Sequence, residues 1–403
     1  MKNEQKFILE CIHSFLGNYN VGKLKMLYES TNDQKLNLLI SQQNLGGFLY
    51  HLYLNKKFKT INIPADTIQL WKKVAGKNSL TNAINDKETF QIVSQLDENN
   101  TDYIYMKGLS TRRRCYNCDY LKYSTDIDIF IKKADYSKVK DILLARGYEI
   151  PYEHYIEDFA VKIPFEEYEN LTFEISFLKR KNALKFIVDL QWDFTFFDKT
   201  SVFHRLYNIN SIYQFKSTDE IEIDEYKLKI FPLEIELINI SFHYVFNHGL
   251  KGMQWLIDIC TFIKNHETKI DFDYIIKIAN TNLKKILGIM LMLSYEFSSK
   301  SKMDKEQKKL FCVDKLLPFE YRLYKSMVFK PDNNSVLSKL ALRIVKILLP
   351  YKMRGRLRVI NYFFFNTDSI GHRLDYGKKT KKFLLPFSLL KLFISDIIRR
   401  KEQ

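Results

Sequence analysis

The sequence predicts an α+β protein in which a mixed β-sheet lies between two helical regions. Apolar residues recur at helical spacing before residue 99, and short runs rich in β-branched and aromatic residues follow up to residue 231, with one clear helix among them. From residue 232 onward the pattern is helical again. We therefore expect an N-terminal helical region (1–99), a sheet domain (100–231) and a C-terminal all-helical layer (232–403) with a basic end.

The N-terminal region has helical periodicity and no motif that points to chemistry. Phe7, Ile8 and Cys11 begin one apolar stripe, and the Asn44-Leu45-Gly46-Gly47 break separates two later helices. Pro64 suits a first helical turn, so a long polar helix is expected from there toward Asn99. We expect these helices to pack against the sheet and to shape the substrate side.

The middle region reads as strands interrupted by one amphipathic helix over 135–146, which Gly147 ends. A hairpin is expected over 220–231, with its turn at Asp224-Glu225, and a polar turn around Glu166 is expected to join two of the strands. The strands before the hairpin are predicted over 103–106, 125–131, 155–163, 171–177 and 186–192.

The last region begins with a helix over 233–246 that Pro232 opens, followed by a second helix from Lys251 past Cys260. Later helices are separated by breaks near Pro318, Pro331, Pro350, Gly371 and Pro386. No internal repeat or low-complexity linker is visible, so these helices are expected to pack as one layer.

The composition is that of a folded protein, because 46% of the residues are hydrophobic and only 13 glycines and 8 prolines occur in 403 residues. The net charge of +16 is uneven, since residues 321–403 hold 19 lysines and arginines against 5 acidic residues. Five cysteines without a secretory signal favour a reducing cytosol, and no run reaches the roughly 18 apolar residues that span a bilayer. A cytoplasmic protein is expected.

The most informative stretch is Thr125-Asp126-Ile127-Asp128-Ile129. On a strand the two carboxylates point to one face while the isoleucines are buried behind them. Two like charges side by side favour a bound cation or proton between them, and hard oxygen ligands suit Mg²⁺. Taken alone, Asp-x-Asp is also typical of an ordinary polar strand end.

Two neighbouring motifs strengthen the functional interpretation. Lys107-Gly108 stands where a strand meets a helix start, a junction at which backbone N–H groups can approach phosphate. Downstream, the strand at 186–192 carries a third carboxylate, Asp189.

In this order the motifs resemble the uncharacterised nucleotidyltransferase family of the DNA-polymerase-β-like superfamily, over about residues 35 to 265. The matching residues are Lys107, Gly108, Tyr116, Lys122, Asp126, Asp128, Asp189, Leu190 and Trp192. The chain departs from the family pattern at Lys122, where arginine is usual, and at Gln191, where histidine is usual. Lysine lacks the planar two-pronged contact of arginine, but neither change removes a carboxylate.

The resemblance implies a polymerase-β-like palm, a bacterial source, and Mg²⁺-dependent transfer of NMP from an NTP to a hydroxyl or phosphate of an unknown small molecule, sugar or protein. Asp126, Asp128 and Asp189 are the predicted catalytic metal ligands, with Mn²⁺ as an alternative ion. The predicted nucleotide-binding residues are Lys107, Gly108, Ser110 and Lys122. His243, Asp258 and Gln191 are predicted to support the site.

Several residues keep two interpretations. Lys107 is either a phosphate contact or a solvated strand end, and Arg112-Arg113-Arg114 either a solvated helix face or a triphosphate contact. His243 is either a packed core residue or functional, with Asp258 as its expected partner. Cys115-Tyr116-Asn117-Cys118 has no second Cys-x-x-Cys, so an unliganded reduced pair is preferred over zinc.

The basic end supplies the alternative functions. Leucines and phenylalanines at 384–393 alternate with Lys391 and precede Arg399-Arg400-Lys401, which fits either an anionic surface at the inner membrane face or an ordinary packed helix. A catalytically silent nucleotide-binding module and an RNA-binding or RNA-modifying protein that uses this end are the competing hypotheses. Nucleic acid is the less favoured partner, since the predicted catalytic region holds only one short basic cluster and a membrane surface or a polyanionic acceptor fits the basic end as well as RNA.

Overall fold

The computed structural model describes residues 1–151, 165–182, 184–193, 202–207, 218–298, 302–330, 342 and 344–365. Within them a six-stranded mixed sheet has the order β3-β4-β2-β1-β6-β5. The strands are β1 (Tyr103–Met106), β2 (Asp126–Ile131), β3 (Glu174–Lys181), β4 (Leu184–Gln191), β5 (Asp219–Ile223) and β6 (Tyr226–Ile230). The expected α+β class with a mixed sheet is confirmed.

The pairing of β2 brings the two acidic motifs together. β2 is antiparallel to β1 and parallel to β4, and Asp128 is the register partner of Asp189. Because parallel partners in register point to the same face, the carboxylates of both strands lie on one side of the sheet. The prediction that the third acid sits on a strand adjacent to the acid pair is confirmed.

The two faces of the sheet pack against different helices. Ile127, Ile129 and Ile131 belong to a core cluster shared with α5 (Ala65–Glu98) and α7 (Tyr136–Ala145). The opposite face contributes Ile104 and Phe130 to a larger cluster shared with α11 (Leu233–Phe246) and α12 (Met253–His266). On that second face the β1 side chains are apolar and covered. The acidic and polar side chains there are Asp126 and Asp128 of β2, Asp189 and Gln191 of β4, and Glu174 and Ser176 of β3.

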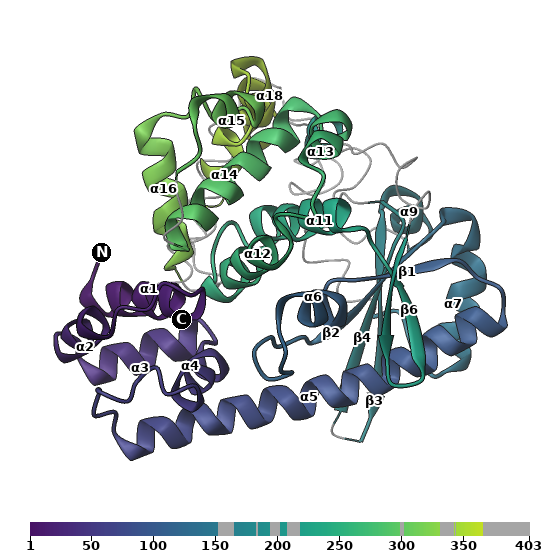
Figure 1. Cartoon of the computed structure of the whole chain (residues 1–403). Coiled ribbons are helices and arrows are strands. Elements are labelled where there is room, and N and C mark those ends of the chain that lie inside the picture. The colour runs from purple at the N-terminus through teal and green to yellow at the C-terminus, as the bar shows by residue number, and fades with distance from the viewer. Residues whose placement is uncertain are drawn as a thin grey trace, which may run out of the picture.

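The N-terminal helices form a small bundle that α5 connects to the sheet (Figure 1). With 34 residues, α5 is about 50 Å long at 1.5 Å per residue, and it begins directly after Pro64, as predicted. The bundle consists of α1 (Asn3–Phe15), α2 (Val21–Glu29), α3 (Asp33–Gln42) and α4 (Gly46–Leu54).

Three asparagines of α5 hold the segment that leads into β2. Asn78, Asn82 and Asn85 lie on one helix face and are buried. Asn82 Nδ2 donates to the carbonyls of Asp119 (2.6 Å) and Lys122 (2.7 Å), and its Oδ1 accepts from the Ser124 N–H. Asn78 and Asn85 donate to the carbonyls of Tyr120 and Ser124 at 3.0 and 2.9 Å. The loop before the acidic strand is therefore fixed to a helix that starts far from it.

The helices after the sheet pack behind α11 and α12 (Figure 1). α11 has the predicted bounds and follows Pro232, while α12 begins two residues later than expected. Among these helices Glu320 is fully buried and pairs with Arg356 at 2.6 Å and Lys285 at 3.6 Å. The helices that follow α12 are α13 (Phe272–Ile278), α14 (Thr281–Phe297), α15 (Lys305–Leu310), α16 (Pro318–Val328) and α18 (Met353–Phe365).

Two predictions about the middle region are corrected. The polar turn around Glu166 is instead a short helix, α9 (Phe165–Leu171), because its apolar residues Phe165 and Tyr168 pack on the sheet core at helical spacing. The strand predicted over 171–177 is shifted to Glu174–Lys181, where it pairs with β4 along its whole length. The predicted strand over 155–163 lies outside the described residues.

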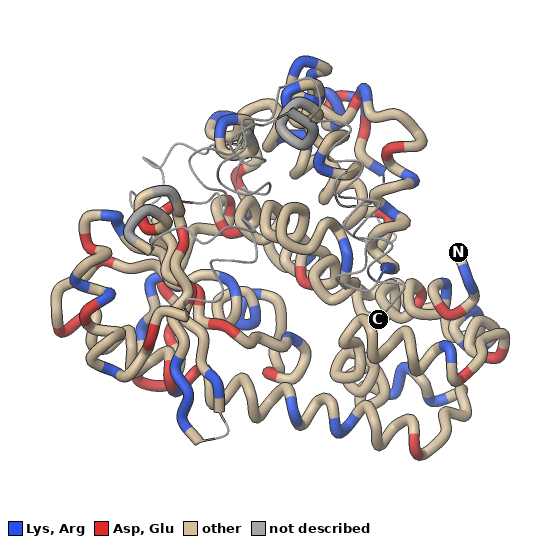
Figure 2. Tube along the Cα trace, turned by 180° about the vertical axis from the view of Figure 1, so that it is seen from behind, with Lys and Arg blue, Asp and Glu red and all other residues tan. Residues whose placement is uncertain are grey.

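Basic and acidic residues are interspersed over both the sheet and the helices (Figure 2). The predicted membrane-facing segment at 384–401 lies outside the described residues. None of the helices within the described residues combines the length and the apolar character needed to cross a bilayer. The division into three domains stays a prediction.

We expect Asn82→Ala to lower the free energy of unfolding by about 3 kcal/mol and Asn85→Ala by about 1 kcal/mol. The difference follows because Asn82 pairs three backbone groups and Asn85 only one, and each buried group left unpaired costs about 1 kcal/mol or more. Urea unfolding followed by circular dichroism measures both values. An equal decrease in the free energy of unfolding for the two variants would contradict the conclusion that Asn82 fixes the loop before β2 to α5.

Candidate active site

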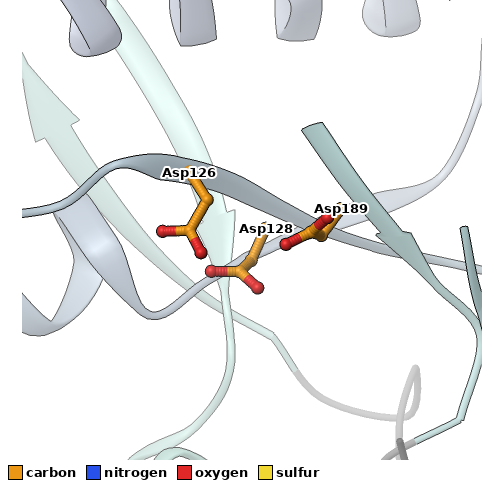
Figure 3. A group of neighbouring side chains, drawn as sticks. All are labelled: Asp126, Asp128 and Asp189. Atoms are coloured by element: carbon orange, nitrogen blue, oxygen red, sulfur yellow. The ribbon is translucent and has the colours of Figure 1, made fainter. Parts of the chain in front are cut away.

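Three carboxylates meet on the second sheet face, where Asp128 is buried and the other two are half-buried. Asp126 and Asp128 come from β2 and Asp189 from β4, and one oxygen of each lies within 4.8 Å of the others (Figure 3). The period of two along β2 and the parallel register with β4 produce this convergence. Within the described residues this is the one group of three or more possible metal ligands that are this close.

The cluster holds its acids in an environment that disfavours negative charge. Burial, together with the charges of Asp128 and Asp189, raises the pKa of Asp126 to about 7. Burial and the charge of Asp128 raise the pKa of Asp189 to about 6, although Ser176 donates to its carboxylate at 2.5 Å. Carboxylates crowded in this way favour a bound proton or a cation between them.

A fourth acid, Glu174 on β3, was not predicted from the sequence. Gln191 Nε2 lies 2.5 Å from Glu174 Oε2 and 3.4 Å from Asp128 Oδ1, so this side chain links the two acids. Burial and the charge of Asp189 raise the pKa of Glu174 well above its ordinary value. Its sequence signal was the alternation Glu174-Ile175-Ser176-Phe177, which places Glu174 and Ser176 on the polar face.

The turn between β1 and α6 (Gly108–Cys115) places a lysine against the aspartates. Lys107 Nζ donates to Asp128 Oδ1 at 2.8 Å, and both side chains are less than a tenth exposed. Burial lowers the pKa of Lys107, but the charges of Asp128 and Glu174 outweigh this and raise it overall. The interpretation of Lys107 as a solvated strand end is therefore wrong.

Gly108 is required by the shape of this turn. Its φ is +30°, and a Cβ there would lie 2.7 Å from the Tyr105 hydroxyl and 3.0 Å from Ser124 Oγ. The Tyr105 hydroxyl in turn accepts from the Leu109 N–H at 3.3 Å. A larger residue would push the turn away from the acidic strand.

A pocket of about 390 Å³, lined mainly by residues with polar side chains, opens beside the carboxylates. Lys107, Gly108, Lys122, Asp126 and Asp128 line it on the sheet side. The other walls come from the α3–α4 turn, the loop before β2 and the α11–α12 region. These walls contain Gln42, Gln43, Asn44, Tyr123, Ser124, Thr125, His243, Asn247, His248, Gly252, Gln254 and Trp255.

Lys122 and Asp258 form a buried ion pair at the wall of this pocket. Lys122 Nζ lies 2.6 Å from Asp258 Oδ2 and 4.7 Å from the centre of the Trp255 ring. Asp258 also accepts from Tyr116 and from Gln254. The expectation that Asp258 reaches His243 is corrected, because the carboxylate is fully engaged by residues of the loop and of its own helix.

His243 lies beside His248 and Trp255. The two Nε2 atoms are 3.0 Å apart, and the His248 ring is stacked on Trp255 at 4.3 Å. Burial, then the charges of Lys107 and His248, lower the pKa of His243 well below its ordinary value. His243 therefore lines the pocket as a neutral imidazole.

Two arginines of the basic run on α6, Arg112 and Arg114, have covered side chains held in ion pairs, whereas Arg113 is exposed, as the solvated-face interpretation expects. Arg112 is 1% exposed and forms ion pairs with Asp86 of α5 and with Asp119. Its Nε lies 3.2 Å from Asp119 Oδ1. Arg114 pairs with Glu236 of α11 and with Asp219. These pairs fasten α6 to its neighbours because a buried guanidinium needs a compensating carboxylate.

Ser110 is not among the residues that line the pocket. It is buried, and its hydroxyl lies 2.9 Å from the Lys107 carbonyl and 3.1 Å from Glu236 Oε1. Its predicted contact with nucleotide finds no support in this geometry, which shows Ser110 shaping the turn.

The Cys-x-x-Cys pair consists of two free thiols with different surroundings. Cys115 Sγ lies 3.4 Å from the Asp258 carbonyl, and Cys118 Sγ lies 3.4 Å from His51 Nδ1. Burial raises the pKa of both thiols, which disfavours the thiolate that metal binding or redox attack requires.

The fold and site define a class of α+β protein with a cluster of three aspartates beside a pocket lined by two lysines. The chain belongs to the uncharacterised nucleotidyltransferase family, whose model matches residues 29–298. This match spans all six strands and the helices that line the pocket. Among curated proteins, none matches the chain. The resemblance inferred from the motifs is confirmed.

We expect Asp126→Asn to raise the melting temperature in EDTA at pH 8 and to change it little at pH 4. The folded-state pKa of about 7 lies above the ordinary value of 3.8, so the folded protein retains a proton that the unfolded chain loses. This group's contribution to stability therefore falls as pH rises from about 4 to 7, and the neutral amide avoids that loss. Thermal unfolding at both pH values measures it.

Asp141→Asn on the exposed side of α7 is the matched control and should show no such pH dependence. If Asp126→Asn shifted the melting temperature equally at both pH values, the charge-crowding account of this site would be wrong.

Proposed function

We propose that this protein is a Mg²⁺-dependent nucleotidyltransferase built on a polymerase-β-like palm. The observation that carries the proposal is the convergence of Asp126, Asp128 and Asp189 within 4.8 Å beside a pocket lined by two lysines. Family membership supports nucleotidyl transfer in general. The metal, the mechanism and the acceptor are parts of the proposal.

In the proposed reaction an acceptor oxygen attacks the α-phosphorus of an NTP in line with the leaving group. The bond from the acceptor oxygen to phosphorus forms, the bond from phosphorus to the bridging oxygen breaks, and pyrophosphate leaves. A hydroxyl acceptor releases its proton to solvent, whereas a phosphate acceptor attacks as the anion. The protein forms no covalent bond to the substrate in such a displacement. Its contribution is to position the reactants and to neutralise developing charge.

The donor set fits Mg²⁺, with Mn²⁺ as an alternative, because it consists of hard carboxylate oxygens. When bound, two such ions neutralise charge on the phosphates and lower the pKa of the attacking hydroxyl. Asp126 and Asp128 would hold both ions, and Asp189 would complete the one on the acceptor side. The Ser176 and Gln191 contacts orient Asp189 and Asp128 for this task.

The remaining residues of the site would bind and orient the substrates. Lys107 and the Gly108 turn lie where the phosphates would meet the aspartates, and Lys122 adds a second positive charge on the same wall. Carboxamides of Gln42, Asn44 and Gln254 extend the pocket away from the metal site. These hydrogen-bonding groups support a polar acceptor, either a hydroxyl or a phosphate of a small molecule, sugar or protein.

We expect Asp126→Asn, Asp128→Asn and Asp189→Asn each to reduce transfer of label from α-³²P NTP by about a thousandfold or more, because each removes a charged ligand of the proposed metals. The assay uses Mg²⁺, each of the four NTPs and a panel of sugars, phosphorylated metabolites and cell extract as acceptors. Asp141→Asn, a surface change, should retain full transfer.

Unchanged labelling in the three site variants would refute the proposal. If Mg²⁺ and NTP raise the melting temperature of the wild-type protein but no acceptor is labelled, a catalytically silent nucleotide-binding module is the better description. Salt-sensitive RNA binding that is lost when residues after Lys378 are deleted would favour the RNA hypothesis.

A further inference from the structure

We infer that the ammonium of Lys107 acts as an internal counter-cation for the aspartate cluster. When a metal binds, this ammonium leaves Asp128 and pairs with the nucleotide phosphates instead. Metal and nucleotide therefore bind cooperatively. This inference rests on the proposed function. Lys107 then has two successive partners, first the Asp128 carboxylate and then the nucleotide phosphates, which replace the ion pair that it loses.

The first partner follows from the contacts of Lys107. Its Nζ lies 2.8 Å from Asp128 Oδ1, an oxygen of the proposed metal-binding group. Both side chains are nearly inaccessible to solvent, so little water is available to screen a second cation beside the ammonium. A divalent ion on Asp128 and the ammonium of Lys107 therefore compete for the same carboxylate.

The second partner follows from where Lys107 lies in the pocket. Lys107 and Gly108 both line the pocket that we assign to the nucleotide. A phosphate chain brought in with the metal would offer the ammonium new oxygens close to the carboxylate that it leaves. Lysine suits such a transfer because it is a point charge on a flexible four-carbon stem.

The backbone of Lys107 stays fixed while its side chain changes partner. Its φ of +51° and ψ of −137° are uncommon for a residue with a side chain. The carbonyl accepts from the Thr111 N–H at 3.0 Å and from Ser110 Oγ at 2.9 Å, which anchors the turn. These two contacts hold the turn in a conformation in which the Lys107 side chain lies against Asp128.

Lys122 provides an internal comparison. It is also buried and lines the same pocket, but its partner is Asp258, which is outside the aspartate cluster. Asp258 is further held by Tyr116 and Gln254. A metal bound to the aspartates does not compete for Asp258, so the ion pair of Lys122 is expected to persist.

The test measures Mn²⁺ binding by electron paramagnetic resonance, with and without a non-hydrolysable α,β-methylene NTP analogue. We expect the wild-type protein to bind Mn²⁺ about tenfold or more tightly when the analogue is present, a typical size for coupling between ligands. Lys107→Met should bind Mn²⁺ alone about tenfold more tightly than the wild type and should lose most of the gain from the analogue.

The matched control is Lys73→Met, a change to an exposed lysine of α5 that does not line the pocket, which should leave the affinity for Mn²⁺ alone within about twofold. Asp126→Asn supplies the baseline for Mn²⁺ bound elsewhere on the protein. If Lys107→Met does not fold, Lys107→Gln removes the charge while keeping a hydrogen-bond donor and provides the same comparison.

Equal or weaker binding of Mn²⁺ alone by Lys107→Met would overturn the inference. If the wild type still binds Mn²⁺ together with the analogue, the proposed function survives that result. Failure of the wild type to bind Mn²⁺ even with the analogue would overturn both the inference and the metal-dependent function.

Discussion

The crowding of negative charge on one sheet face is the constraint on which the rest of the structure depends. The register of β2 with β4 brings three aspartates together, and β3 adds Glu174. Such a cluster is unfavourable by itself, and the neighbouring elements supply what offsets it. Lys107 comes from the β1–α6 turn, Ser176 from β3 and Gln191 from β4. The helical regions then complete the pocket around this cluster instead of covering it.

Much of the sheet was predictable because its signals are local. The bounds of β1 and α11 agree with the sequence prediction, and the Asp224-Glu225 turn joins β5 to β6 as expected. Alternating polarity along β2 was sufficient to place Asp126 and Asp128 on one face. The pairing with Asp189 came from the family resemblance, since no local pattern states which strands become neighbours.

The parts that escaped prediction depend on long-range contacts. Asn82 and Arg112 are polar residues on helices, which ordinarily face solvent, yet each is buried because a distant segment supplies its partners. Glu174 was visible only as one polar position in a strand whose start was misplaced. Asp258 was assigned the wrong partner because the loop that carries Lys122 folds back over α12. This contact joins two residues that are 136 positions apart in the sequence.

The asparagine face of α5 limits how this protein can change in length during evolution. Each residue inserted into a helix rotates everything beyond it by about 100°. A single insertion between Asn78 and Asn85 would therefore turn part of this face away from the loop that precedes β2. Insertions and deletions in this stretch should be tolerated only in combinations that restore the same face. The N-terminal half of α5 carries a similar restriction, because its buried Trp71 packs in the core of the N-terminal bundle.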